Sequence, residues 1–282
     1  MRLIRSASEM AKVSARLQRE DRRIGVVPTM GALHDGHLSL IRRAVSQNGI
    51  VIVTVFVNPL QFGPREDFRR YPSNLPRDLG LCRNADADIV FAPLPREIYP
   101  PGFQTSVEIG SLGQRWEGRF RPGHFRGVAT VVTILFELTR PTNAYIGQKD
   151  YQQALIIRRL VQDFWLPIRV HVLPTVREPD GLAMSSRNAY LRPAHRRQAA
   201  VIPRALREAH RRIHQGERRS AAIVHTMRRL IHSEPDLRID YLAVADPETL
   251  EPTTRIRGRV VLLAAVRVGA TRLIDNLLVD VP

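Results

Sequence analysis

The run Val51–Val57, VIVTVFV, is the feature that most constrains the fold of this chain. Continuous, mainly apolar and β-branched runs are typical of strands that are buried on both faces of a parallel sheet. Further strand-like runs lie at 24–27, 89–92, 143–146 and 168–173, and helix-like segments lie at 38–45, 75–85, 128–138 and 151–164. This alternation predicts an α/β fold, a Rossmann-like parallel sheet with right-handed crossovers and helices on both faces.

The pattern changes at Arg177–Gly181, a turn-rich break. Beyond it, the residue spacing predicts helices at 196–215 and 221–233, followed by strands at 239–244, 260–266 and 271–274. We therefore expect a Rossmann-like domain over residues 1–176 and a smaller C-terminal α+β domain over 177–282. Within the first domain, residues 118–127 are rich in glycine, arginine and aromatic side chains, which predicts a mobile or ligand-facing loop.

Composition excludes several classes of protein. Of the 282 residues, 44% are hydrophobic, so the chain can bury a substantial core. No apolar run is long enough to span a bilayer, and the first residues lack the continuous apolar stretch of a signal peptide. The single cysteine, Cys82, lies among apolar neighbours and is predicted to be a buried structural thiol. Together these features predict a cytoplasmic protein with no membrane partner.

The net charge of +16 raises the question of a nucleic-acid partner. The basic residues are spread along the whole chain as arginine pairs, which favours a solvated surface over a nucleic-acid groove. We therefore expect no nucleic-acid partner, although the positive field would attract small anions. Only Lys12 and Lys149 are lysine among 43 lysine and arginine residues. A site that keeps lysine in such a chain suggests a need for a compact point charge.

Two histidines, His34 and His37, lie where the strand at 24–27 leads into the helix that follows. Ligands of open α/β sheets bind beyond the carboxyl ends of the strands, and a helix N-terminus there favours phosphate. Gly36 has no side chain, so a ligand can approach the backbone closely, and Gly31 also lies near the pair. The pair could instead cap the helix or contribute to a zinc site, although no further zinc ligands are evident.

Three more polar clusters follow strands or the domain break. Gly147–Asp150 places Lys149 at a strand end, with Gln153 about one turn on, although Asp150 could simply cap the helix. Met184–Arg187 offers two hydroxyls and an arginine, and could equally be an ordinary loop. Gln61 follows the strand at 51–57 and could be only a turn residue. Three of the four clusters lie at predicted strand ends of one sheet, and the Met184–Arg187 cluster follows the final strand of that sheet.

The sequence resembles the pantoate–β-alanine ligase family, which belongs to the His-x-Gly-His nucleotidyltransferases. The resemblance rests on four motifs in order: Val27–His37 (VPTMGALHDGH), Phe56–Phe62 (FVNPLQF), Lys149–Gln153 (KDYQQ) and Gly181–Asn188 (GLAMSSRN). One departure is Gln148, where the family more often has an acidic residue. The resemblance implies that pantoate, β-alanine and ATP give pantothenate, AMP and pyrophosphate through a pantoyl adenylate, in pantothenate and coenzyme A biosynthesis.

The resemblance also implies a role for individual residues. His37 is implied as the transition-state or proton donor, with His34 and Lys149 as the other catalytic residues. Gln61 and Gln153 are implied to bind pantoate, and Gln61 also β-alanine. The residues implied to bind ATP are Met30, Gly31, Ala32, Leu33, His34, Asp35, Gly36, His37, Gly147, Gln148, Lys149, Asp150, Val176, Met184, Ser185, Ser186 and Arg187.

The implied cofactor is Mg²⁺, bound mainly through the ATP phosphates and with few protein ligands. The family further implies a homodimer, and a C-terminal domain that closes over the active site. Two rival interpretations are another His-x-Gly-His enzyme, such as an aminoacyl-tRNA synthetase, and a basic RNA-binding protein without catalysis. The chain is short for the former, and the latter leaves the histidine, lysine and serine clusters unexplained.

Overall fold

The computed structural model describes residues 1–64 and 66–281 and divides into two compact units. The first unit consists of Met1–Gln148 and Gln152–Pro174, and the second of Lys149–Tyr151 and Thr175–Pro282. The main division therefore lies between Pro174 and Thr175, and the start of one helix is grouped with the second unit.

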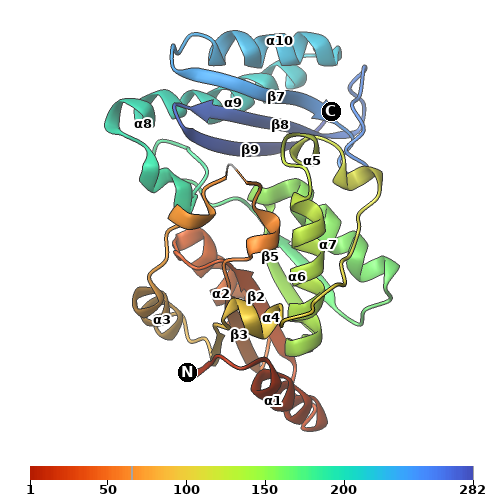
Figure 1. The fold of residues 1–282 in the computed structure, drawn as a ribbon. Helices are drawn as coiled ribbons and strands as arrows, with labels where there is room; N and C mark the ends of the chain where they lie inside the picture. The colour runs from red at the N-terminus through yellow and green to blue at the C-terminus, as the bar shows by residue number, and fades with distance from the viewer. Residues whose placement is uncertain (65, 282) are drawn as a thin grey trace. The chain divides into compact units, whose positions relative to one another are not determined.

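The first unit is built on a parallel sheet, which across the described residues has the strand order β1-β4-β3-β2-β5-β6 (Figure 1). The strands are β1 (Arg2–Ile4), β2 (Ile24–Thr29), β3 (Ile50–Val55), β4 (Ile89–Phe91), β5 (Asn143–Gly147) and β6 (Arg169–Leu173). From β2 the chain builds outward to β3 and β4 on one side, then crosses to β5 and β6 on the other. The strand order thus reverses at β2 and β5, which is where α/β sheets of this type bind ligands.

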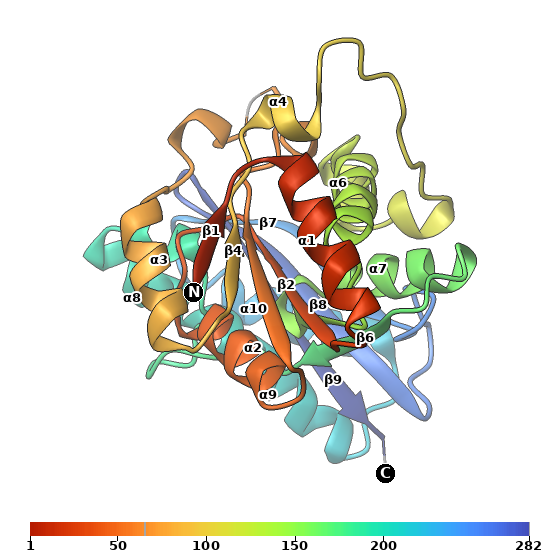
Figure 2. The same cartoon turned by 90° about the horizontal axis from the view of Figure 1, so that it is seen from below.

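Helices cover both faces of this sheet, as Figure 2 shows. The helices are α1 (Ala7–Arg19), α2 (Asp35–Val45), α3 (Leu75–Asn84), α4 (Pro95–Ile98), α5 (Glu117–Phe120), α6 (His124–Thr139) and α7 (Tyr151–Asp163). Short 3-10 turns lie at η1 (Pro59–Gln61), η2 (Phe68–Arg70), η3 (Ser111–Gly113) and η4 (Gln148–Asp150). Two apolar clusters fill the unit, one with α2 and α3 on one face and one with α1, α6 and α7 on the other.

The segment predicted as a loop at 118–127 is instead largely helical. Helix α5 covers its start, and α6 begins at His124, after Gly123 in the left-handed region at φ 81°. The prediction was wrong because the first turn of α6 contains His124, Arg126 and Gly127, a composition that is typical of loops. Gly127 lies in this helix because of a long-range packing contact. A Cβ atom at Gly127 would lie 2.3 Å from the carbonyl oxygen of Leu60, so glycine lets α6 pack directly on η1.

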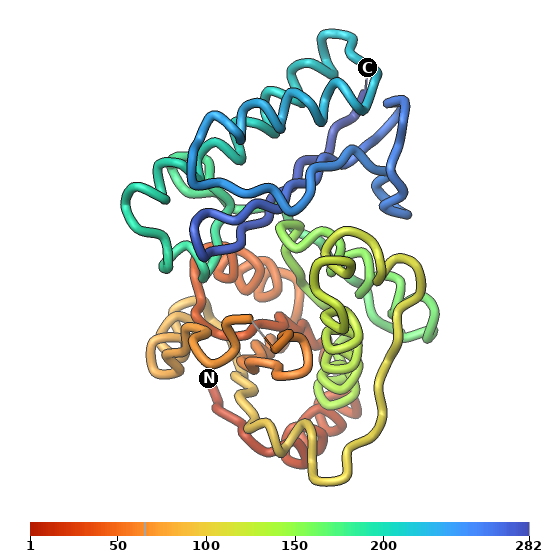
Figure 3. Tube along the Cα trace, turned by 45° about the horizontal axis from the view of Figure 1, so that its top comes forward, coloured from red at the N-terminus to blue at the C-terminus, as the bar shows by residue number. Residues whose placement is uncertain are grey.

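The chain from α4 to α6 follows α6 on the outside, as the yellow part of the trace in Figure 3 shows. The N–H of Val107 donates to Oγ1 of Thr130 on α6 at 3.0 Å. The buried amide of Gln152 donates to the carbonyls of Leu112 and Arg115 and accepts from the N–H of Glu117. This extended segment is therefore held along its length without belonging to the sheet.

The second unit has an antiparallel sheet in the order β7-β8-β9 and helices packed on it around a single apolar cluster. Its elements are η5 (Ser186–Tyr190), α8 (Pro193–Ala199), α9 (Val201–His214), α10 (Ser220–Ile231), β7 (Leu237–Ala245), β8 (Arg259–Val268) and β9 (Thr271–Asp280). The single helix predicted at 196–215 is two helices, which meet at Ala200. A parallel sheet between helices and a smaller α+β unit confirm the predicted fold class.

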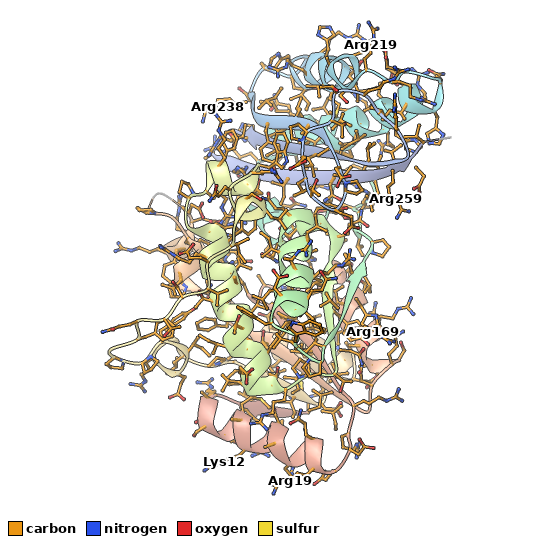
Figure 4. All side chains as sticks on the ribbon, turned by 90° about the vertical axis from the view of Figure 1, so that its right-hand side faces the viewer. Lys12, Arg19, Arg169, Arg219, Arg238 and Arg259 are labelled. Atoms are coloured by element: carbon orange, nitrogen blue, oxygen red, sulfur yellow. The ribbon has the colours of Figure 1, made fainter. Side chains whose placement is uncertain are left out.

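Basic side chains point outward from many different elements, as Figure 4 shows. The labelled, exposed examples are Lys12, Arg19, Arg169, Arg219, Arg238 and Arg259. Across residues 1–64 and 66–281, every helix is too short or too polar to span a membrane.

Candidate active site

The loop that follows β2 has a tightly fixed backbone. Oγ1 of Thr29 donates to the carbonyl of Thr54 at 2.6 Å and accepts from the N–H of Gly31 at 3.1 Å. Gly31 has φ 81° and Ala32 has φ 50°, so the chain turns through two left-handed residues. A Cβ atom at Gly31 would lie 2.9 Å from a carboxylate oxygen of Asp78. Gly31 is therefore required both by its left-handed backbone conformation and because a side chain there would clash with Asp78.

Asp78 on α3 holds the same loop from the other side. One carboxylate oxygen accepts the N–H of Ala32 and the other accepts the N–H of Leu33, both at 2.9 Å. The side chain is 1% exposed. A carboxylate can accept two such bonds at once, and bonds to an ionised acceptor are stronger than neutral ones. Sequence reasoning missed Asp78, because its partners lie more than forty positions away.

The two histidines lie together at the start of α2, with ring centroids 4.1 Å apart. His34 is the N-cap residue, and its backbone N–H donates to Nδ1 of His37 at 3.3 Å. A ring nitrogen that accepts a hydrogen bond is unprotonated, so the proton of neutral His37 resides on Nε2. The contact with the helix cap therefore uses Nδ1 of His37, and Nε2 carries the proton of the neutral ring.

The zinc alternative for the histidine pair finds no support in the surrounding residues. Among residues 1–64 and 66–281, no three histidine, cysteine, aspartate or glutamate side chains come together in an arrangement that could hold a metal.

The buried Cys82 confirms the prediction of a structural thiol. Burial, with the nearby charge of Asp78, raises the pKa of this thiol to about 12.

Gln61 is buried at the end of η1, and its side-chain amide has a defined orientation. Nδ2 of Asn58 donates to Oε1 of Gln61 at 3.1 Å, and Nε2 of Gln61 lies 3.0 Å from the sulfur of Met30. The amide nitrogen, a donor, therefore faces the loop that precedes His34. Asn58 is fixed in turn by the hydroxyl of Tyr99, which donates to its Oδ1 at 2.7 Å. The first unit thus brings Met30 and Gln61 together.

The two adjacent glutamines at the start of α7 have different surroundings. Gln152 is 4% exposed and makes the bonds to the 112–117 segment described above. Gln153 is only partly buried. The structure thus gives Gln152 a packing role, whereas the sequence singled out Gln153 for the substrate.

Of the remaining predicted residues, Gly147 ends β5 and Gln148 begins η4 in the first unit, whereas Lys149, Asp150, Val176 and Met184–Arg187 fall in the second unit. Nζ of Lys149 lies 3.7 Å from Oδ1 of Asp150, and the carbonyl of Lys149 accepts from Nδ2 of Asn276 at 2.9 Å. The carbonyl of Val176 accepts the N–H of Met184 at 3.0 Å, which places these two predicted nucleotide contacts next to each other.

A hydrogen-bonded turn connects Val176 to the serine cluster. Arg177 forms a bidentate ion pair with Asp275, at 2.7 and 3.0 Å, and also donates to the carbonyl of Gly181. Oγ of Ser185 accepts the N–H of Arg187 at 3.3 Å and begins η5. Oγ1 of Thr175, beside Val176, is buried and has no hydrogen-bond partner in the described part of the chain.

The family model described as pantoate-beta-alanine ligase matches residues 2–278. The chain belongs to this family. It is 52% identical to the pantothenate synthetase of Roseiflexus sp. (strain RS-1) over 280 residues, which cover 99% of this chain and 100% of that protein. The resemblance inferred from the four motifs is confirmed.

Solved structures of the pantoate-β-alanine ligase family match over the same length. The pantothenate synthetase from Thermus thermophilus matches with a TM-score of 0.93 and 48% identity, and the match covers 98% of this chain and 99% of that one. The pantoate-beta-alanine ligase from Francisella tularensis, complexed with beta-gamma ATP and beta-alanine, has a TM-score of 0.82 and 35% identity, with coverage of 99% and 97%.

Proposed function

We propose that this protein is an ATP-dependent ligase that joins (R)-pantoate to β-alanine through a pantoyl adenylate and releases AMP and pyrophosphate. Membership of the pantoate-β-alanine ligase family supports this function. The observation that carries it is the ring of His37, held by the backbone of His34 so that Nε2–H is the donor at the end of the central strand β2. Such a donor suits the phosphates of a nucleotide.

In the first step, a carboxylate oxygen of pantoate attacks the α-phosphorus of ATP and pyrophosphate leaves. Negative charge grows on the α-phosphate and on the leaving group, and fixed donors aimed at that charge are usually the largest catalytic term. We assign Nε2–H of His37 to this role, with His34 and Lys149 in support. The amide nitrogen of Gln61, held by Asn58, donates to pantoate, and Gln153 contributes a second amide.

In the second step, the amine of β-alanine attacks the activated acyl carbon and AMP leaves. Gln61 is proposed to contact β-alanine as well. The remaining nucleotide contacts are proposed as Met30–Asp35, Gly36, Gly147, Gln148, Asp150, Val176 and Met184–Arg187.

Mg²⁺, if bound, would be held mainly by the phosphates of ATP and would offset their negative charge. The chain needs few ligands for an ion held in this way, because Mg²⁺ keeps several waters and binds substrate phosphates directly. The proposal further includes a cytoplasmic homodimer, without nucleic-acid or membrane partners. It keeps the expected division into a nucleotide- and pantoate-binding domain over 1–176 and a smaller domain over 177–282 that closes over the active site.

The test is the exchange of labelled pyrophosphate into ATP, measured without β-alanine. Exchange that requires pantoate is expected, because the adenylate forms before the amine reacts. Exchange that requires an amino acid instead would overturn the proposal.

A matched pair of variants tests His37. His37→Asn keeps an acceptor near Nδ1 for the N–H of His34 but removes the Nε2 donor. We expect its exchange rate to fall by about 100-fold or more, the typical loss for one transition-state donor. His37→Gln places an amide nitrogen near the Nε2 position and should recover part of that loss. A loss of less than about threefold in His37→Asn would exclude the role.

Lys149 is tested by substitution with arginine, which retains the charge. Lysine supplies a compact and flexible point charge, whereas arginine supplies a planar fork that cannot occupy the same position. We expect Lys149→Arg to lower the exchange rate, and the same substitution at Lys12, on the outer side of α1, to leave it unchanged. Normal turnover in Lys149→Arg would show that the site does not require the compact charge of lysine.

A further inference from the structure

The main-chain carbonyl of Gln61 is held by side chains from the junction of α5 and α6. Nδ1 of His124 lies 2.8 Å from this oxygen and Nη2 of Arg121 lies 3.3 Å from it. Glu66 pairs with Arg121 through both carboxylate oxygens, at 2.7 and 2.8 Å. We call Glu66, Arg121 and His124 the Gln61 clamp.

The guanidinium of Arg121 is directed at protein acceptors on every side. Its Nε and Nη2 donate to Glu66, Nη2 also donates to Gln61, and Nη1 donates to Nε2 of His124 at 3.1 Å. Nη1 also lies 3.9 Å from a carboxylate oxygen of Glu117. An arginine used in this way orients its neighbours, so we assign it a positioning role and not contact with a substrate.

His124 has a single hydrogen-bonding arrangement in the Gln61 clamp. Arg121 can only donate, so Nε2 of His124 must accept, and the ring proton therefore resides on Nδ1 and is donated to Gln61. The ring is 7% exposed. Burial, with the positive charge of Arg121, lowers the pKa of His124 to about 4, against the weaker opposing influence of Gln61, Glu117 and Glu66. The ring consequently stays neutral at neutral pH, with a fixed donor direction.

We propose that the Gln61 clamp positions the amide of Gln61 for pantoate, by fixing its backbone while Asn58 fixes its side-chain oxygen. This inference rests on the proposed function, in which Gln61 binds pantoate. The clamp acts on the backbone at 2.8 Å and Asn58 on the amide at 3.1 Å. With both ends of the residue held, the amide nitrogen can point in one direction only. Neither Arg121 nor His124 needs to touch the substrate.

Two substitutions of His124 separate positioning from general packing. Asparagine places an amide nitrogen close to the Nδ1 position and can still donate to Gln61. Glutamine reaches the Nε2 position, where it can accept from Arg121, but it loses the donor to Gln61. We expect His124→Gln to raise KM for pantoate by about tenfold, the equivalent of one hydrogen bond, and His124→Asn to stay within about threefold of wild type. KM for ATP and kcat should change little in either variant.

The matched control is His171→Asn, at a partly buried histidine of the same unit whose Nε2 pairs with Asn143 at 2.8 Å. It should leave KM for pantoate unchanged. Equal effects of His124→Asn and His124→Gln, or equal changes in KM for pantoate and ATP, would overturn the inference. Absence of pantoate-dependent exchange in the wild type would instead overturn the proposed function.

Glu66→Gln provides a second variant in case His124→Gln does not fold. It keeps the shape of the side chain but removes the negative charge that holds Arg121. We expect KM for pantoate to rise about threefold, with KM for ATP unchanged, because a partly exposed ion pair typically changes an equilibrium constant by a few-fold. An unchanged KM for pantoate in Glu66→Gln would contradict the inference.

Discussion

Asp78→Asn is the most direct test of how the loop after β2 is built. The two carboxylate oxygens each accept one backbone N–H, from Ala32 and Leu33, at 2.9 Å. Asparagine has the same shape but offers one oxygen and one NH₂ group. One of the two backbone N–H groups must therefore face another donor in a site where the side chain is 1% exposed. No cavity is created, so the hydrogen bonds alone determine the result.

The magnitude follows from the hydrogen bonds lost. A bond to a charged acceptor contributes about 1.5–3 kcal/mol, and a buried donor without an acceptor costs about 1–3 kcal/mol, two effects that partly overlap. We expect the free energy of unfolding of the first unit to fall by about 3 kcal/mol. With a urea dependence of about 3 kcal/mol per molar, the unfolding midpoint should fall by about 1 M. Because the loop leads into His34, KM for ATP should rise about tenfold or more, the equivalent of one hydrogen bond.

The assay combines urea unfolding, followed by circular dichroism, with pyrophosphate exchange at varied ATP. Asp88→Asn is the matched control, because exposed Asp88 accepts a single backbone N–H, from Val51 at 2.8 Å, and an asparagine oxygen can replace it. The control should lose less than about 1 kcal/mol. An unfolding midpoint and a KM for ATP in Asp78→Asn that match those of Asp88→Asn would refute the reasoning.

Three further predictions concern the first unit. Lowering the pH from 6.5 towards 4 should destabilise the wild type by up to about 3 kcal/mol more than His124→Asn. The pKa of His124 is about 4 in the folded protein and 6.5 in the unfolded chain, so between these values protons bind the unfolded chain first and the stability present above pH 6.5 is lost. Urea unfolding midpoints measured across this pH range test the difference. Gly127→Ala should lower the free energy of unfolding by about 3 kcal/mol, because the new Cβ clashes with Leu60. Gly80→Ala, with no atom within 4 Å of the new Cβ, should instead stabilise α3 by about 0.5–1 kcal/mol, and thermal melting measures both changes. The thiol of Cys82, with its pKa raised to about 12, should resist a disulfide reagent at pH 8 until urea unfolds the protein; rapid labelling of the native protein would contradict its burial.

The fold could be predicted from the sequence because its signals are local. The run at 51–57 marks the buried strand β3, although the strand itself ends at Val55. The loop at 30–37 was identifiable for the same reason, since its glycines and histidines are adjacent in the chain. Family membership followed from four short motifs of this kind, and the match over residues 2–278 confirmed it.

The supporting residues of the site could not be predicted, because their contacts are long-range. His124 reaches Gln61 across 63 positions, and Asp78 reaches Ala32 across 46. The segment that contains His124 has the composition of a loop, and only its packing against η1 explains why Gly127 lies inside a helix. A lone histidine in a glycine-rich stretch was the available signal, but nothing in the sequence indicated its partner.

The position of β1 has a consequence for the order in which the protein can assemble. This strand, Arg2–Ile4, lies at the sheet edge and pairs with β4, Ile89–Phe91, although β2 and β3 are made before β4. During synthesis its first apolar residues must wait several seconds for their partner to leave the ribosome. The buried side chain of Ile4 therefore docks late, onto a sheet whose centre can already have formed. The edge of the sheet is therefore completed by a strand that was synthesised well before its pairing partner.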